Sequence, residues 1–338
     1  MTEQSFAQLS NGLVYGAMTA LALAMFAYAA ELAFGTRSRV GRTVAALEPA
    51  RASVLVGAAG PAADQGSPTG GDGHGALREA SPARQRRADQ YGGIGLSLTV
   101  AAVGLLALGI VCRGFAAGRA PWGNMYEFSC ACAEVVLVVF LLVAWRLPAL
   151  RYLGLFVVVP ALLTLGLAVA VLYVPAGPLV PALRSYWLVI HVAAAIVSGA
   201  VFTVGGVVTV LYLLQERWES RGQVNALSRR LPDSESLDRS AYRLFAFVFP
   251  LWTFAIMAGA IWAENAWGKY WSWDPKETWA LVTWVVFACY LHARATAGWK
   301  GRGAAYIALA GLSCFIFNYF GVNIWFSGLH SYGGLPNK

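Results

Sequence analysis

Charged residues are scarce in this sequence. Asp, Glu, Lys and Arg make up 12% of its 338 residues, whereas 58% of the residues are hydrophobic. Soluble domains typically contain about 25% charged and about 45–50% apolar residues, so the composition excludes an ordinary soluble enzyme. It also excludes a disordered chain and a nucleic-acid-binding module, because both require more charge.

Cysteine is rare as well, and the five cysteines form no metal-binding or redox motif. The sequence contains neither C-x-x-C nor C-x-x-C-H. It therefore excludes a disulfide scaffold, a thioredoxin-like reductase, a zinc site and a c-type cytochrome. We expect the C-x-C pair Cys130 and Cys132 to be small buried side chains on different faces of a helix.

Long apolar segments are abundant, and they predict an all-α, polytopic integral membrane protein. A helix needs about 20 apolar residues to cross a bilayer. We expect about eight transmembrane helices, of which the last two are short. The expected segments are Gly12–Phe34, Gly93–Val111, Phe128–Trp145, Tyr152–Val174, Tyr186–Leu214, Leu244–Trp262, Thr278–His292 and Ala304–Phe320.

Composition divides the chain into three parts. Residues 1–34 contain the first helix, which we expect to be retained because Glu3 and no Lys or Arg precedes it. Residues 35–90 are rich in Gly, Ala, Pro and Ser, and they predict a disordered linker in which His74 has no function. Residues 91–338 form the membrane core.

Lys and Arg are distributed unevenly between the two sides of the membrane. The loops 35–90, 146–151, 215–243 and 293–303 contain 19 of the 25 basic residues, and the opposite side contains 6. Loops rich in Lys and Arg remain in the cytoplasm. We therefore expect both termini and the loops 112–127, 175–185 and 263–277 to face outward from a bacterial plasma membrane.

Six tryptophans crowd into the outward segment 262–284, WAENAWGKYWSWDPKETWALVTW. An aromatic belt at the membrane interface needs only one or two aromatics per helix end. We therefore favour a flat aromatic surface for a large planar ligand, because indoles combine an apolar face with a polar N–H. The candidate ligand-contacting residues in this segment are Trp267, Trp271, Trp273, Asp274 and Trp279.

Asp274 has a second interpretation that stays open here. It suits the N-cap of the seventh helix, with Pro275 at the first helical position and Glu277 in the first turn. This local role competes with any role in ligand binding.

Two histidines come to the same outer side by independent topology. His191 lies in the second turn of the fifth helix, and His330 lies in a Gly-rich segment beyond the eighth. Two neutral imidazoles beside a wide aromatic surface are what a bis-histidine haem site requires. His292 lies at the inner end of the seventh helix, where it is either an interfacial polar residue or part of a second site.

Three motifs resemble the CcsA/ResC family of system II cytochrome c biogenesis. WGKYWSWDPKETWALVTW is similar to the family's WWD signature, GVNIWFSGLHSYG to its C-terminal motif, and PWGNMYEF to its short outward motif. The resemblance covers roughly residues 91–338.

The resemblance implies a haem-handling protein that works with a ResB/CcsB-type membrane subunit. Together they would move haem b outward and attach it to the C-x-x-C-H of apocytochrome c, as a holocytochrome c synthase complex. His191 and His330 match the family's outer axial ligands. His292 matches its inner haem ligand, for which the partner supplies the second histidine. Whether this chain itself is an enzyme stays open.

Three other functions remain as alternatives: system I-type delivery of haem to a haem chaperone, transport of a small solute or lipid, and a scaffold of a membrane complex. Transporters commonly contain repeats or broken helices at mid-membrane, and the sequence has no recognisable internal repeat. Glu134 in the third helix is the notable charge within a segment.

Overall fold

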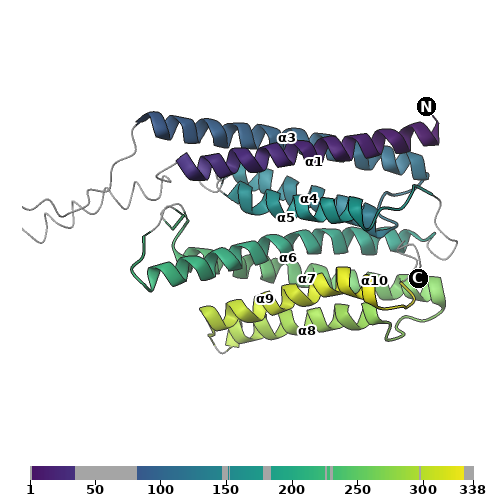
Figure 1. Cartoon of the computed structure of the whole chain (residues 1–338). Coiled ribbons are helices and arrows are strands. Elements are labelled where there is room, and N and C mark those ends of the chain that lie inside the picture. Colours follow the sequence, from purple (N-terminus) through teal and green to yellow (C-terminus); the bar gives the residue numbers. More distant parts are fainter. Residues whose placement is uncertain are drawn as a thin grey trace, which may run out of the picture.

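The computed structural model describes residues 2–34, 82–146, 151, 153–177, 184–224, 227–228, 231–296 and 298–330. These residues form a helical bundle without a strand among them, as the hydropathy pattern predicts (Figure 1). The helices are α1 (Glu3–Phe34), α3 (Pro82–Ala117), α4 (Met125–Arg146), α5 (Gly154–Ala170), α6 (Tyr186–Glu219), α7 (Ser234–Trp267), α8 (Pro275–Thr296), α9 (Arg302–Ile316), the π-helical turn η3 (Phe317–Gly321) and α10 (Val322–Trp325).

Each expected membrane segment coincides with one of these helices. Six of the described helical segments are long and apolar enough to cross a membrane, namely α1, α3, α4, α6, α7 and the continuous stretch Arg302–Trp325. α5 is apolar but shorter, at 17 residues. The chain is a multi-span membrane protein.

α3 begins at Pro82, earlier than the expected start at Gly93. Hydropathy detects the part of a helix that can lie in lipid, whereas a helix can continue beyond the lipid as a polar segment. Residues 82–90 of the expected linker are therefore helical. Residues 35–81, which include His74, lie outside the described residues.

α7 also extends beyond its apolar segment, beginning at Ser234 rather than Leu244. The side chain of Asp233 caps this end, because it accepts a hydrogen bond from the Ser236 N–H at 2.9 Å. The other end stops at Gly268, whose φ of 71° is the left-handed conformation that ends many helices. After this cap at Gly268, the chain continues into the tryptophan-rich loop that precedes α8.

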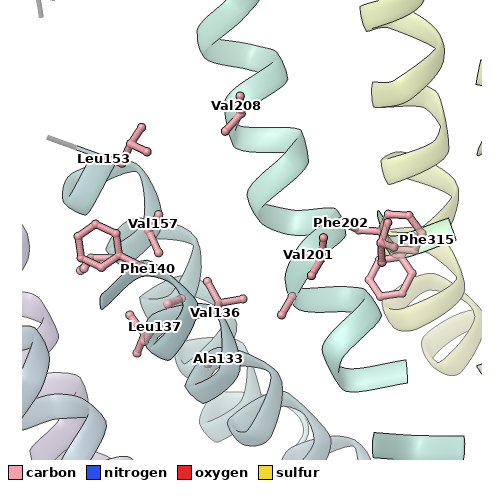
Figure 2. Packing of buried hydrophobic residues seen from close by; sticks show 14 of the residues in the cluster. Ala133, Val136, Leu137, Phe140, Leu153, Val157, Val201, Phe202, Val208 and Phe315 are labelled. Atoms are coloured by element: carbon pink, nitrogen blue, oxygen red, sulfur yellow. The ribbon is translucent and has the colours of Figure 1, made fainter. Parts of the chain in front are cut away.

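Aromatic side chains join the helices in the core of the bundle. Phe202 of α6 stacks on Phe287 of α8 at 4.4 Å between ring centroids, and Phe315 of α9 lies 5.4 Å from Phe202. Figure 2 shows Phe202 and Phe315 in contact, with Val201 facing the residues of α4 and α5. This packing fixes α6, α8 and α9 against one another and so fixes the helices that carry the candidate site.

The start of α1 and the end of α10 lie at the same end of the bundle (Figure 1). The segments 118–124 between α3 and α4 and 268–274 between α7 and α8 lie at this end too. The tryptophan-rich segment and the C-terminal segment thus lie at the same end. This agrees with the expected topology, in which both termini and the loop 263–277 face one side of the membrane.

Candidate functional site

A cavity opens at this end of the bundle. Its empty volume is about 1210 Å³ when the solvent-filled mouth is included. Its walls come from α6, α7, the start of α8, the π-helical turn, and the segment before α4. Histidine, tryptophan and amide side chains share the lining, namely His191, His330, Trp122, Trp252, Trp262, Trp267, Trp271, Asn124, Asn318 and Asn323. The lining is mostly apolar and aromatic with a few polar side chains, which is typical of a site that binds an organic ligand.

His191 is held in the cavity wall by α7. Its Nδ1 lies 2.7 Å from the carbonyl oxygen of Ala255. A carbonyl can only accept, so Nδ1 donates and the neutral ring carries its lone pair on Nε2. A Cβ on Gly259 would lie 2.8 Å from the ring, so glycine at that position makes room for the imidazole.

His330 is held in the same way by a carboxylate. Its Nδ1 donates to Oδ2 of Asp274 at 2.9 Å. Burial lowers the pKa of His330, and the charge of Lys276 lowers it further, although the hydrogen bond to Asp274 opposes both. The ring is therefore neutral near pH 7 and carries its lone pair on Nε2, which is the form that binds metal.

Asp274 is the junction between α8 and the C-terminal segment. Its Oδ1 accepts from the Leu329 N–H at 2.6 Å, and its Oδ2 accepts from the Lys276 N–H at 3.1 Å. Burial raises the pKa of Asp274, but His330 and these two amides outweigh that effect and lower it. A Cβ on Gly328 would clash with Oδ1 of Asp274, so only glycine permits this close approach.

The local role expected for Asp274 is confirmed. It precedes Pro275 at the start of α8, and its carbonyl accepts from the Thr278 N–H at 2.9 Å. Glu277 reaches back to the Asp274 N–H at 3.2 Å, which completes a capping box. The same carboxylate that caps α8 thus positions His330, so the two roles do not compete.

The indole of Trp262 lies beside both histidine rings. Its ring stacks on His191 at 6.1 Å and 11°, and it meets His330 edge-on at 5.9 Å between centroids. The two imidazoles therefore contact one buried indole from different elements. Trp267 lies against both Trp262 and His330, at 4.8 and 5.1 Å.

The other expected tryptophans occupy different places. Trp271 lines the cavity. Trp273 has a φ of 59° and is 68% exposed, and it lies outside the cavity lining. Trp279 also lies outside the lining and packs on Phe317 at 4.4 Å.

A polar wall faces the cavity from α8 and the π-helical turn. Tyr319 donates to the Met125 carbonyl at 3.1 Å, which ties the turn to α4. The ammonium of Lys276 lies 6.0 Å from the Tyr319 ring centroid. Asn318 is 5% exposed, and its side-chain oxygen has no hydrogen-bond partner among the described residues. π-Helical turns occur often at functional sites, and this one directs two polar side chains into the cavity lining.

His292 lies near the other end of α8 and contributes nothing to this cavity. Its side chain is exposed, and its imidazole makes no hydrogen bond with the residues that the structure describes. Nearby, Arg294 forms an ion pair with Asp238 at 2.7 Å. The structure thus brings His191 and His330 together and leaves His292 apart.

Sequence reasoning missed two kinds of residue in this lining. Trp122 belongs to the PWGNMYEF motif, whose resemblance could have assigned it to the site. Asn318 and Tyr319 carry no sequence signal, because the π-helical turn that orients them cannot be recognised from an apolar segment.

Comparison with known proteins settles the family. Residues 122–330, which include every part of this cavity, match the sequence model of the family described as Cytochrome C assembly protein. The chain belongs to this family. The resemblance inferred from its tryptophan-rich and C-terminal motifs is thereby confirmed.

Curated relatives of this cytochrome c assembly protein agree. This chain is 40% identical over 260 residues to "Cytochrome c biogenesis protein CcsA" of Parasynechococcus marenigrum. The match covers 68% of this chain and 83% of the relative. The protein of the same name from Porphyra purpurea is 36% identical over 268 residues, covering 68% and 84%. Membership of the family implies that this membrane protein acts in cytochrome c biogenesis and handles haem.

Proposed function

We propose that this protein binds haem b in the cavity and presents it at the outer face of a bacterial plasma membrane. The two axial nitrogens come from His191 and His330. The porphyrin ring lies among the indoles of Trp262, Trp267 and Trp271. With a ResB/CcsB-type membrane subunit, the protein attaches the haem to the C-x-x-C-H segment of apocytochrome c. Both chain termini lie on the outer side.

The shared hydrogen-bonding pattern of the two histidines carries this proposal. Each ring donates from Nδ1 to a fixed acceptor, the Ala255 carbonyl or the Asp274 carboxylate. Metal-binding histidines usually donate their other ring nitrogen in this way, since the donation fixes the tautomer and orients Nε2. Two such rings beside one indole, in a cavity lined by further tryptophans, suit the ligation of a porphyrin iron.

The protein's contribution to the chemistry is orientation. Bound haem supplies two vinyl groups, and each takes up a cysteine S–H across its C=C bond to give a thioether without a leaving group. The thiolate is the reactive form of cysteine, so the apocytochrome must arrive reduced. His191 and His330 hold the ring at a fixed depth, and the indoles limit the access of water.

His292 is proposed as a ligand of a second, inner haem site. It lies too far along α8 to reach the same iron, because each helical residue adds about 1.5 Å. Its exposed ring, near an end of α8, is available to a partner subunit. That subunit supplies the second histidine of the inner site.

Replacing each outer histidine tests the proposal. We expect His191→Ala and His330→Ala, expressed with the partner, to lose the low-spin haem spectrum and most of the cytochrome c yield. Added imidazole should restore both, since it refills the empty coordination position. His74→Ala is the matched control and should change neither. Normal spectra and normal yields in both outer variants would contradict the proposal.

The same preparation separates this function from delivery to a haem chaperone. We expect the purified protein and its ResB/CcsB-type partner to form holocytochrome c from reduced apocytochrome and haem alone. Product that forms only after a haem chaperone is added would favour the system I-type role.

A further inference from the structure

The cavity lining includes a cation, Lys276, to which the proposed binding of haem by histidines and tryptophans gives no role. Lys276 is half-buried in the second position of α8 and lines the cavity. Among the described residues, no carboxylate lies within 4.0 Å of its ammonium. A cation at the edge of an apolar cavity attracts an anionic group of the ligand.

The other cations at this end of the bundle are placed differently. Lys269 is exposed and does not line the cavity. Arg119 donates to both carboxylate oxygens of the buried Glu127, at 2.6 and 3.2 Å, and also to the carbonyl of Gly177. Its guanidinium is thus committed to protein partners, so Lys276 is the cation in the described cavity lining whose charge is unpaired.

Asn318 provides an independent observation. The residue is 5% exposed, and its side-chain oxygen lacks a hydrogen-bond partner in the described part of the chain. A buried amide without a partner is costly, so an amide in a cavity wall points to a bound polar group. A half-turn of the amide presents N–H donors instead of the oxygen, so Asn318 can serve an anion.

Among the residues that the structure describes, Glu277 is the one carboxylate in the cavity lining, and the loop before α8 engages it. It accepts from the Ser272 N–H at 2.8 Å and from the Asp274 N–H at 3.2 Å. Its carboxylate is thus bound to the loop before α8, and among the described residues it forms no ion pair with Lys276.

We propose that Lys276 and Asn318 form a carboxylate subsite, which takes a propionate of the porphyrin and so sets the in-plane orientation of the ring. This inference rests on the proposed haem-binding function. The propionates and the vinyl groups of haem b lie at opposite edges of the ring. Holding a propionate at the start of α8 therefore directs the vinyl edge away from α8 and towards the incoming cysteines.

Titration with two forms of the ligand tests the subsite. The full chain in detergent micelles is titrated with haem b and with its dimethyl ester, which lacks the negative charges. We expect Lys276→Gln to weaken the binding of haem b about tenfold and to leave the binding of the ester unchanged. Lys269→Gln, in the loop that precedes α8 and outside the cavity lining, should change neither affinity.

Two further variants keep the test decisive. Asn318→Leu should also reduce the preference for haem b over the ester, and it removes an unpartnered amide, so we expect it to fold. Arg184→Gln alters an adjacent cavity that Arg119 and Arg184 line. If Arg184→Gln alone removes the preference, or if Lys276→Gln weakens both ligands equally, the subsite is overturned.

Failure of the subsite and failure of the proposed function give different results. Equal affinity of the wild-type chain for both ligands, with a bis-imidazole spectrum, overturns the subsite alone. Absence of a bis-imidazole spectrum with either ligand overturns the haem site itself, and the subsite with it.

Discussion

The two ends of α8 place histidine in opposite environments. At its start, Asp274 holds the Nδ1 of His330 beside Trp262, and His191 approaches the same indole from α6. Near its other end, the ring of His292 is exposed and has no hydrogen-bond partner among the described residues. The first environment fixes the tautomer of each imidazole and the direction of its Nε2 before a ligand arrives. The second environment leaves the tautomer and the ring orientation of His292 undetermined.

The difference indicates which site one chain can complete alone. A metal site needs its ligands oriented by neighbouring hydrogen bonds, and such neighbours are nearly as important as the ligands. The cavity end has them within this chain. We infer that the His292 end acquires them only with a partner subunit, and the following predictions test that contrast.

The largest effect is expected from Asp274→Ala. This change removes the acceptor of His330, the acceptor of the Leu329 amide and the cap of α8. We expect haem affinity of the purified chain to fall about 10- to 100-fold, the usual range for losing a partner of a metal-binding histidine. Asp274→Asn keeps an acceptor and should lose less. Unchanged affinity in Asp274→Ala would remove the basis for the orientation of His330.

A smaller effect is expected from Gly259→Ala. The added methyl group would lie 2.8 Å from two atoms of the His191 ring, so the imidazole must move. Alanine favours a helix over glycine by about 1 kcal/mol, so the variant should stay folded while its haem affinity falls about tenfold. Gly104→Ala in α3 is the matched control, because nothing lies within 4 Å of its added Cβ. Equal affinities for the two variants would contradict the placement of His191.

The tryptophans should differ by position. Trp267→Leu removes an indole that lies 5.1 Å from His330, and we expect haem affinity to fall a few-fold, as aromatic contacts contribute about 0.5–1.5 kcal/mol. Trp273→Leu alters an indole that is 68% exposed and lies outside the cavity lining, so haem affinity should stay the same. A larger loss in Trp273→Leu than in Trp267→Leu would mean that the ring binds elsewhere on the cluster.

The smallest effect on the cavity is expected from His292→Ala. Haem bound by the chain alone should keep its spectrum and affinity, since His292 lies outside the cavity. In the complex with the partner, the same variant should lose one bound haem per complex, measured by pyridine haemochrome analysis. Loss of haem from the isolated chain would contradict the separation of the two ends.

Much of this arrangement could be predicted from the sequence. Apolar segments predict the helices, and topology brings His191, His330 and the tryptophan-rich segment to one end. Helix boundaries could not be predicted from hydropathy alone, because α3 and α7 begin with polar turns that lie outside the apolar segments.

The finer geometry of the site depends on long-range contacts. The DPKE sequence predicts the cap of α8, but nothing local connects Asp274 with His330, which lies 56 residues later. Spacing also could not separate Trp271, in the lining, from Trp273, which turns away through a left-handed backbone conformation. The contribution of Asn318 depends on a π-helical turn whose sequence resembles any apolar helix.

The most direct test is a cryo-electron microscopy structure of the full chain with haem bound. We expect one porphyrin in the cavity beside Trp262 and Trp267, with its iron between the Nε2 atoms of His191 and His330. A porphyrin outside this cavity, or an iron that either histidine fails to reach, would contradict it.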